Sequence, residues 1–274
     1  MPLLFEFYRK LPPDTKRRLK RGWFEMLSRM DTGDDLLFMN HGYTDHRNPS
    51  HGLDLQARDE PYRYPIQLYH RIATGIEWKG LRGLEIGCGR GGGTAYVQRY
   101  LGPKSMVGID ITESAIRFCN EAFDVPGLSF QVGDAEALSF PDESFDAVLN
   151  VESCLHYKNI DLFFNEALRV LKPGGALLLG DYRKAPVVSR LYRYMEQSDF
   201  EMAHSEDLSA DVLAAMEIEA DAKLALVERH APRPLRSMFT KFAGATGEGS
   251  RELEQFRTGE RVYLRFVLRK PASV

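Results

Sequence analysis

The sequence predicts an α/β fold with a doubly wound, mostly parallel sheet and helical lid elements. Short apolar runs alternate with helix-period patterns over residues 76–185, which is typical of parallel strands joined by crossover helices. A glycine-rich loop, residues 87–93, joins the first of these strands to a helix. In this class of fold, such a loop lies at the end of the sheet where ligands bind.

The local patterns place five buried strands and three helices. The predicted strands end at residue 86 and then cover residues 106–110, 128–132, 145–150 and 176–181. The predicted helices cover residues 94–101, 113–123 and 161–171, and Pro173 and Gly174 end the last of them. Alternating apolar residues over 262–268 predict a strand that joins the sheet late. No further strand can be placed between residues 186 and 260, where the pattern is mostly helical.

Differences in composition divide the chain into four segments. Residues 1–75 are rich in aromatic and basic side chains and are expected to form an N-terminal helical lid segment. Residues 76–185 form the ligand-binding core. Residues 186–260 are expected to form a helical substrate lid, and residues 261–274 a C-terminal strand that returns to the core sheet.

Composition and charge exclude several classes of protein. The net charge of −3 gives no basic excess that would hold a nucleic acid. The three cysteines have neither the even number of a disulfide framework nor a metal-ligand spacing, and with no other ligand cluster we expect no metal. No apolar run reaches the ~18 residues that a membrane span needs. The N-terminus becomes charged too early for a secretory signal, so we expect a cytoplasmic protein.

The glycine-rich loop is the strongest indication of a ligand site. Glycines let the backbone turn sharply and approach a ligand closely. Gly87, Gly89 and Gly92 satisfy the dinucleotide pattern G-x-G-x-x-G, and Asp110 lies where a ribose-binding acid is expected. This pattern alone leaves a nicotinamide dinucleotide as an alternative ligand.

Polar residues around the loop favour S-adenosylmethionine over a dinucleotide. Glu85 precedes the first glycine, and a carboxylate there suits a cationic ammonium and sulfonium better than an anionic pyrophosphate. Asp134 follows the third strand and can accept a hydrogen bond from an adenine amine. Asn150 and Glu152 end the fourth strand and are expected to face the same ligand. We therefore expect S-adenosylmethionine as the cofactor.

These motifs, in this order, resemble those of class I S-adenosylmethionine-dependent methyltransferases, which have a Rossmann-like fold. The resemblance covers roughly residues 80–182 and includes Leu171-Lys172-Pro173-Gly174-Gly175. It implies that Gly87 and Gly89 pack against the methionyl part and that Asp110 takes the ribose hydroxyls. The expected cofactor-binding residues are Tyr43, Glu85, Gly87, Cys88, Gly89, Gly91, Asp110, Ile111, Asp134, Ala135 and Asn150.

A closer likeness involves the flanking segments. Residues 37–43, 68–71, 89–93 and 148–153 look like the mycobacterial phthiotriolone-type lipid methyltransferases and related bacterial natural-product O-methyltransferases. This resemblance implies methylation of a hydroxyl on a small, apolar lipid or polyketide-like acceptor. The expected partners are that acceptor and, in a possible homodimer, a second copy of the chain.

Three residues are candidates for catalysis. His156 follows the fourth strand and titrates in the range of a general base, although a histidine there also suits the wall of the adenosyl pocket or a core hydrogen bond. Glu152 is a candidate partner that orients His156, or a polar wall near the donor. His41 is placed to approach the substrate, with a packed or surface histidine as the alternative.

Three other activities remain open from the sequence. A C- or N-methyltransferase acting on a similar small molecule would have the same donor site. A cyclase or binding scaffold would keep the fold and the cofactor without methyl transfer, because a fold does not fix a function. An NAD-dependent oxidoreductase would use the same glycine pattern, but Glu85 and the later motifs count against it.

Overall fold

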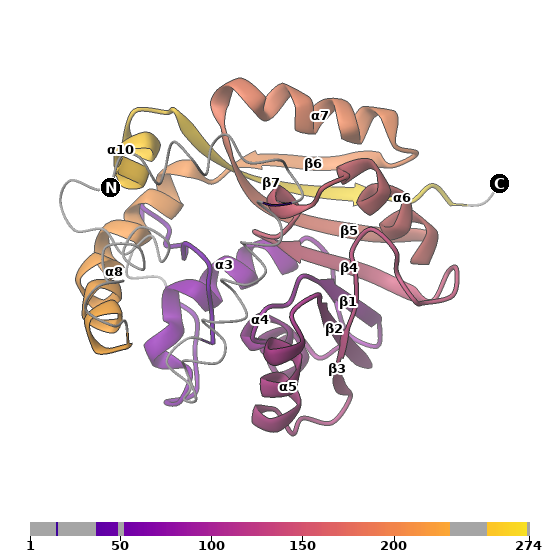
Figure 1. The fold of residues 1–274 in the computed structure, drawn as a ribbon, viewed down its shortest axis with the longest axis horizontal. Helices are drawn as coiled ribbons and strands as arrows, with labels where there is room; N and C mark the ends of the chain where they lie inside the picture. Colours follow the sequence, from indigo (N-terminus) through magenta and orange to yellow (C-terminus); the bar gives the residue numbers. More distant parts are fainter. Residues whose placement is uncertain (1–14, 16–36, 49–51, 231–250, 273–274) are drawn as a thin grey trace.

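A computed structural model describes residues 15, 37–48, 52–230 and 251–272 of the 274-residue chain. Its centre is a seven-stranded sheet with the order β3-β2-β1-β4-β5-β7-β6, which Figure 1 shows from β3 at the bottom to β6 near the top. The strands are β1 (Arg82–Ile86), β2 (Ser105–Asp110), β3 (Leu128–Val132), β4 (Phe145–Val151), β5 (Leu171–Lys184), β6 (Glu201–Asp207) and β7 (Arg261–Arg269). The predicted α/β fold class is confirmed.

Helices connect the strands and cover the sheet (Figure 1). The α-helices are α3 (Arg63–Ala73), α4 (Gly92–Tyr96), α5 (Glu113–Ala122), α6 (Ile160–Val170), α7 (Val188–Gln197), α8 (Ser209–His230) and α10 (Arg251–Arg257). Short helical turns are η1 (Glu60–Tyr62), η2 (Val97–Leu101), η3 (Cys154–His156) and η4 (Ala185–Val187). Among the described helices, none combines the length and the apolar character that a membrane span requires.

The sheet separates two large apolar cores, as expected when both faces are covered. Successive residues of β4 alternate between them: Val148 belongs to the core that includes Phe163 of α6, whereas Leu149 belongs to the core that includes Ile72 of α3. Five strands are parallel, and β7 runs antiparallel between β5 and β6. The C-terminal alternating segment therefore returns to the sheet as the sequence predicts.

The main difference from the sequence-based expectation is β6. Residues 201–207 lie in the stretch predicted to be helical, and no strand was placed there. Six of the seven residues of β6 are exposed, so the segment lacks the apolar alternation that marks a half-buried strand. Its pairing with β7, which includes a register shift between Met202 and His204, makes it an edge strand.

Two other boundaries also differ. The helix predicted from residue 94 begins at Gly92 and turns into the π-helical η2 at Val97. The fifth strand begins at Leu171 rather than at Ala176. Pro173 and Gly174, which the sequence predicts as the end of the preceding helix, are already part of this strand.

Candidate active site

The carboxyl ends of β1 and β4 are the place where a ligand is expected. The chain passes from β1 to β2 and β3 on one side, then returns to β4 on the other side of β1. In open α/β sheets, ligands bind at the carboxyl ends of the strands where the order reverses in this way. The glycine loop follows β1 and Glu152 follows β4, so both predicted groups of site residues meet at this reversal.

The glycine loop has a backbone that glycine adopts readily and other residues do not. The φ angle is +78° at Gly87, +54° at Gly89 and +79° at Gly91. A Cβ on Gly87 would stand 1.9 Å from Oγ of Ser153, so this glycine makes room for a protein side chain. A Cβ on Gly89 would meet only the terminal methyl of Met39, at 2.9 Å. Gly89 is therefore the part of the glycine loop that leaves space for a ligand.

Asp110, at the end of β2, fixes the position of this loop. Its Oδ2 accepts the N–H of Gly89 at 3.0 Å, and its Oδ1 accepts the N–H of Thr112 at 2.8 Å. Burial raises the pKa of Asp110, while hydrogen bonds from Thr112 and Gly89 oppose the rise. Cys88 is buried near Asp110, and Ile111, the next residue after Asp110, is half-buried.

Glu85 lies deeper than the sequence suggested. Its carboxylate is fully buried, and it accepts hydrogen bonds from the hydroxyl of Tyr69 at 2.8 Å and from Thr94. Burial raises the pKa of Glu85 to about 7, although both hydrogen bonds lower it. Both oxygens are thus occupied by protein groups, and a direct contact with a cationic ligand stays a prediction.

The remaining cofactor candidates lie at three places. Asp134 follows β3, and its Oδ1 accepts the N–H of Glu136 at 3.0 Å, while the neighbouring Ala135 is buried. Asn150 is also fully buried, and its amide donates to the carbonyl of Ile86 and to a tyrosine hydroxyl. Asn150 therefore ties the end of β4 to the end of β1, a role that its position in the sequence did not indicate.

Tyr43 belongs to an N-terminal strap, which we define as residues 37–48. The strap is held by backbone hydrogen bonds from Tyr43 to Tyr64 and from Thr44 to Asp211. Among the charged groups that act on the Tyr43 hydroxyl are Asp211 and Arg71, whose effects on its pKa oppose each other. None of these partners is a predicted cofactor residue, so a bond from Tyr43 to the methionyl carboxylate stays a prediction.

The strap brings His41 to the end of β4, where it pairs with Glu152. Nδ1 of His41 lies 2.7 Å from Oε2 of Glu152, and the backbone N–H of His41 donates to Oε1 at 3.0 Å. Glu152 has a φ of +50°, a conformation that costs a non-glycine residue about 1–3 kcal/mol and that clusters at functional sites. The pairing of His41 with Glu152 was not anticipated, because the sequence suggested His156 as the partner of Glu152.

A second carboxylate and two rings complete the surroundings of His41. Nε2 of His41 lies 3.7 Å from Glu252 of α10, and its ring packs edge-on against Tyr182 at 4.5 Å and near Phe256. Burial alone would lower the pKa of His41, but Glu152 and Glu252 outweigh burial and raise it to about 9. His41 is therefore an imidazolium at neutral pH, half-buried between two acids.

His156 lies on η3 and is half-buried. Its backbone N–H donates to the carbonyl of Ser153 at 2.9 Å, which closes the short helical turn. The residues on either side of it, Leu155 and Tyr157, line a cavity of about 440 Å³, whereas His156 is not among the lining residues. A role of His156 as the base stays a prediction.

Two tyrosines that line the cavity also contact the predicted site residues. Tyr157 lines it and donates or accepts hydrogen bonds of 2.8 Å with Ser153 and Asn150, next to Gly87. Tyr182 also lines the cavity and contacts His41. The sequence did not single out Ser153, Tyr157 or Tyr182. Their aromatic side chains were the available signal in the sequence. The fold was needed to show that Tyr157 and Tyr182, among the many tyrosines, line the same cavity.

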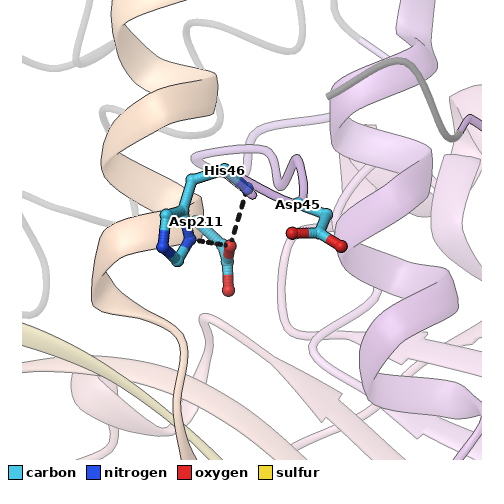
Figure 2. Close-up of side chains that lie close together, drawn as sticks. All are labelled: Asp45, His46 and Asp211. Atoms are coloured by element: carbon cyan, nitrogen blue, oxygen red, sulfur yellow. Dashed lines mark hydrogen bonds and ion pairs between the residues drawn. The ribbon is translucent and has the colours of Figure 1, made fainter. Parts of the chain in front are cut away.

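Asp45, His46 and Asp211 form a group of metal-type ligand atoms among the described residues, all within 4.8 Å of one another. Figure 2 shows that the bonds within the group join His46 to Asp211, with Nδ1 of His46 2.6 Å from the Asp211 carboxylate. Asp45 instead accepts the N–H groups of Arg47 and Asn48 in its own turn. The group fastens the strap to α8, and the expectation of no metal stays a prediction.

Comparison with known proteins identifies the class. Residues 84–179 match the methyltransferase domain family. A putative sarcosine dimethylglycine methyltransferase from Galdieria sulphuraria has the same fold, with a TM-score of 0.64 and 17% identity over 81% of this chain and 93% of that one. The family match therefore identifies a methyltransferase that depends on S-adenosylmethionine, and the prediction of this cofactor is confirmed.

Sequence relatives give the family. The probable phthiotriol/phenolphthiotriol dimycocerosates methyltransferase 2 of Mycobacterium ulcerans is 37% identical over 231 residues, 84% of this chain and 89% of the relative. The fatty-acid O-methyltransferase of Mycolicibacterium smegmatis is 38% identical over 240 residues, 88% of this chain and 85% of the relative. The chain belongs to the family of these mycobacterial methyltransferases, and the resemblance predicted from the sequence is confirmed.

Proposed function

We propose that this enzyme transfers a methyl group from S-adenosylmethionine to a hydroxyl oxygen of an apolar, lipid-like acceptor. The observation that carries the proposal is the half-buried His41–Glu152 pair at the end of β4, next to a tyrosine that lines the cavity. The names of the two relatives, which refer to phthiotriol dimycocerosates and to fatty acids, support a lipid acceptor. An aliphatic hydroxyl needs a group that takes its proton, and the pair supplies one.

The residues at the glycine loop fit the cofactor. Gly89 lets a ligand approach the backbone closely, because a Cβ there would occupy the space between the backbone and the terminal methyl of Met39. Asp110 keeps acceptor capacity beyond its two N–H partners, since each carboxylate oxygen has more than one lone pair, so it can also take the ribose hydroxyls. Asp134 and Ala135 are the residues that we expect at the adenine. When bound, the cofactor supplies a methyl group activated on a cationic sulfur.

Glu152 is the group that we propose receives the acceptor's proton. With a pKa of about 9, His41 already carries a proton at neutral pH and is not available as the base. Instead, His41 holds both oxygens of Glu152 in place through its backbone N–H and its ring. The hydroxyl oxygen becomes positively charged as it is methylated, and its proton then passes readily to a nearby carboxylate.

The test compares Glu152→Gln with His156→Ala. Each variant is incubated with labelled S-adenosylmethionine and 1,2-dodecanediol, and S-adenosylhomocysteine and the methylated product are measured by mass spectrometry. We expect Glu152→Gln to lower kcat by about 10²- to 10⁴-fold, the usual contribution of a general base, with little change in S-adenosylhomocysteine affinity. We expect His156→Ala to lower kcat less than tenfold.

Two results would contradict the proposal. A large loss in His156→Ala together with an intact Glu152→Gln would move the base to His156. Methylation of a carbon or nitrogen acceptor, with none of a panel of hydroxylated lipids accepted by the wild-type enzyme, would replace O-transfer by one of the alternative reactions.

A further inference from the structure

The cavity beside Tyr157 and Tyr182 has an unusual charge for this protein. The chain as a whole carries more acids than bases, 39 against 36. Among the described residues that line the cavity, the charged ones are all cationic: Lys158, Arg183, Lys184, Arg190 and Arg261. The charged side chains of the lining are therefore positive, although the net charge of the chain is negative. A positively charged lining favours an anionic ligand.

Two of these cations are already neutralised by acids behind the cavity wall. Arg183 lies 2.8 Å from Asp181, which is fully buried, and its guanidinium also contacts the Cys154 thiol. Arg261 lies 2.6 Å from Glu252 and sits over the ring of Tyr182. These two arginines link residues of the cavity lining to acidic side chains, and they add little net charge to the cavity.

Of the other three cations, Lys158 has a partner of its own, and Lys184 and Arg190 provide the surplus charge. Within the described part of the chain, neither has an ion-pair partner or a side-chain hydrogen bond. Both are exposed, Lys184 at the end of β5 and Arg190 in the first turns of α7. They therefore lie at the mouth of the cavity, where their charges remain available to a ligand.

Apolar side chains also line the cavity. Leu191 is buried, and Leu155 and Ile160 are half-buried. Val187 exposes 37% of its surface, so the apolar lining continues outward to the cations. The cavity thus combines an apolar interior with a basic rim, a combination that fits an amphiphile rather than a wholly neutral hydrocarbon.

We propose that Lys184 and Arg190 bind an anionic head group of the acceptor, so that the enzyme selects acidic amphiphiles over neutral ones. This inference rests on the proposed function in taking the cavity as the acceptor site. The apolar chain lies along Leu155, Ile160 and Leu191, and the hydroxyl to be methylated reaches the end near Tyr182. The two cations set specificity and take no part in the chemistry.

Direct binding tests this inference without methyl transfer. A fluorescent fatty acid, 11-(dansylamino)undecanoate, is displaced by dodecanoate, by dodecyl phosphate or by neutral 1-dodecanol. We expect both anions to bind at least tenfold more tightly than the alcohol at 50 mM salt, and the difference to shrink at 500 mM as the charges are screened. The two anions separate a carboxylate preference from a phosphate preference.

Charge-matched variants locate the site. The double variant Lys184→Gln/Arg190→Gln should lose about tenfold in affinity for dodecanoate and keep its affinity for 1-dodecanol. The control Lys79→Gln/Lys104→Gln removes the same charge from exposed positions elsewhere and should leave both affinities unchanged. Melting temperatures establish that both variants fold.

Three outcomes would overturn the inference: equal affinity for acid and alcohol, an equal loss in both double variants, or no binding of any of these probes. Methyl transfer to the neutral 1,2-dodecanediol with any of these outcomes would leave the proposed O-methylation standing. Conversely, selective binding of the acids by an enzyme that methylates no hydroxyl would leave the anion site standing and refute the proposed reaction.

Discussion

At the scale of single residues, the site consists of groups whose properties depend on burial. Glu85 lies in β1 and Asp110 ends the neighbouring β2. Glu85 is enclosed by Tyr69 and Thr94, whereas Asp110 holds the glycine loop in place. His41 is basic because two acids surround it, not because of its neighbours in the sequence. The chemistry of each group therefore follows from its contacts in the folded chain.

Gly89→Ala tests whether the glycine loop binds the cofactor. Alanine at a φ of +54° costs about 1 kcal/mol, and its methyl would stand in the space we assign to the cofactor. Gly102→Ala is the matched control, because its φ is +66° and nothing lies within 4 Å of the added Cβ. Calorimetry with S-adenosylhomocysteine should show at least a tenfold loss for Gly89→Ala and none for Gly102→Ala. Equal affinities for the two variants would place the cofactor elsewhere.

The His41 pair predicts a pH dependence of stability. The folded-state pKa of about 9 lies above the unfolded value of 6.5, so the protonated pair stabilises the fold fully below pH 6.5 and this contribution is lost as the pH rises through 9. The wild type should lose about 2 kcal/mol more than His41→Gln between pH 7 and pH 9.5. Urea unfolding at both pH values measures this difference. Parallel pH profiles of the two proteins would show that the pair contributes no such coupling.

At the scale of elements, the strap at residues 37–48 connects parts that are distant in the sequence. It touches α3 through Asn40 and Tyr43, α8 through His46, and the end of β4 through His41. Figure 2 shows the fastening to α8 at Asp211. Because the strap carries His41, its attachment to α8 helps to position Glu152.

Asp211→Ala should loosen the strap. Losing the carboxylate removes the side-chain bond and one backbone bond to His46, a partly exposed pair worth about 1 kcal/mol. Hydrogen exchange at the amides of residues 42–46 should quicken about fivefold, and kcat should fall while S-adenosylhomocysteine affinity stays constant. Asp124→Ala, an exposed acid away from the strap, is the control. Unchanged exchange in Asp211→Ala would show that the backbone bonds alone hold the strap.

At the scale of the whole molecule, β7 joins the edge strand β6 to the parallel part of the sheet. It pairs with β5 along nine residues and with β6 on its other edge. Phe266 of β7 is fully buried in the core that includes α6 and α7, and its ring meets Tyr192 edge-on at 5.4 Å. The last strand of the chain is thus a central part of the fold.

Phe266→Ala should destabilise the protein by about 3–5 kcal/mol, because it removes a buried ring and leaves a cavity. Val132→Ala is the control, since Val132 lies at the end of β3 with 47% of its surface exposed and should cost about 0.5 kcal/mol or less. Urea denaturation measures both variants. A loss below 1 kcal/mol for Phe266→Ala would mean that β7 is peripheral to stability.

Local sequence patterns were enough to predict the parallel strands, the crossover helices and the glycine loop. These features depend on local periodicity and on backbone conformations that glycine favours, as at Gly87 and Gly89, so they can be read from neighbouring residues. The resemblance then gave the cofactor and the family. The edge strand β6 could not be found in this way, because its exposed residues carry no apolar pattern.

Which side chains meet became evident from the folded chain alone. His41 and Glu152 are separated by 111 residues, and Glu152 pairs with His41 rather than with the nearby His156, because the strap crosses the end of β4. The cavity likewise gathers residues of η3, β5, α7 and β7. Contacts of this kind depend on strand order and helix packing, which no local pattern specifies, and for that reason the proposed base and the proposed anion site emerged only from the fold.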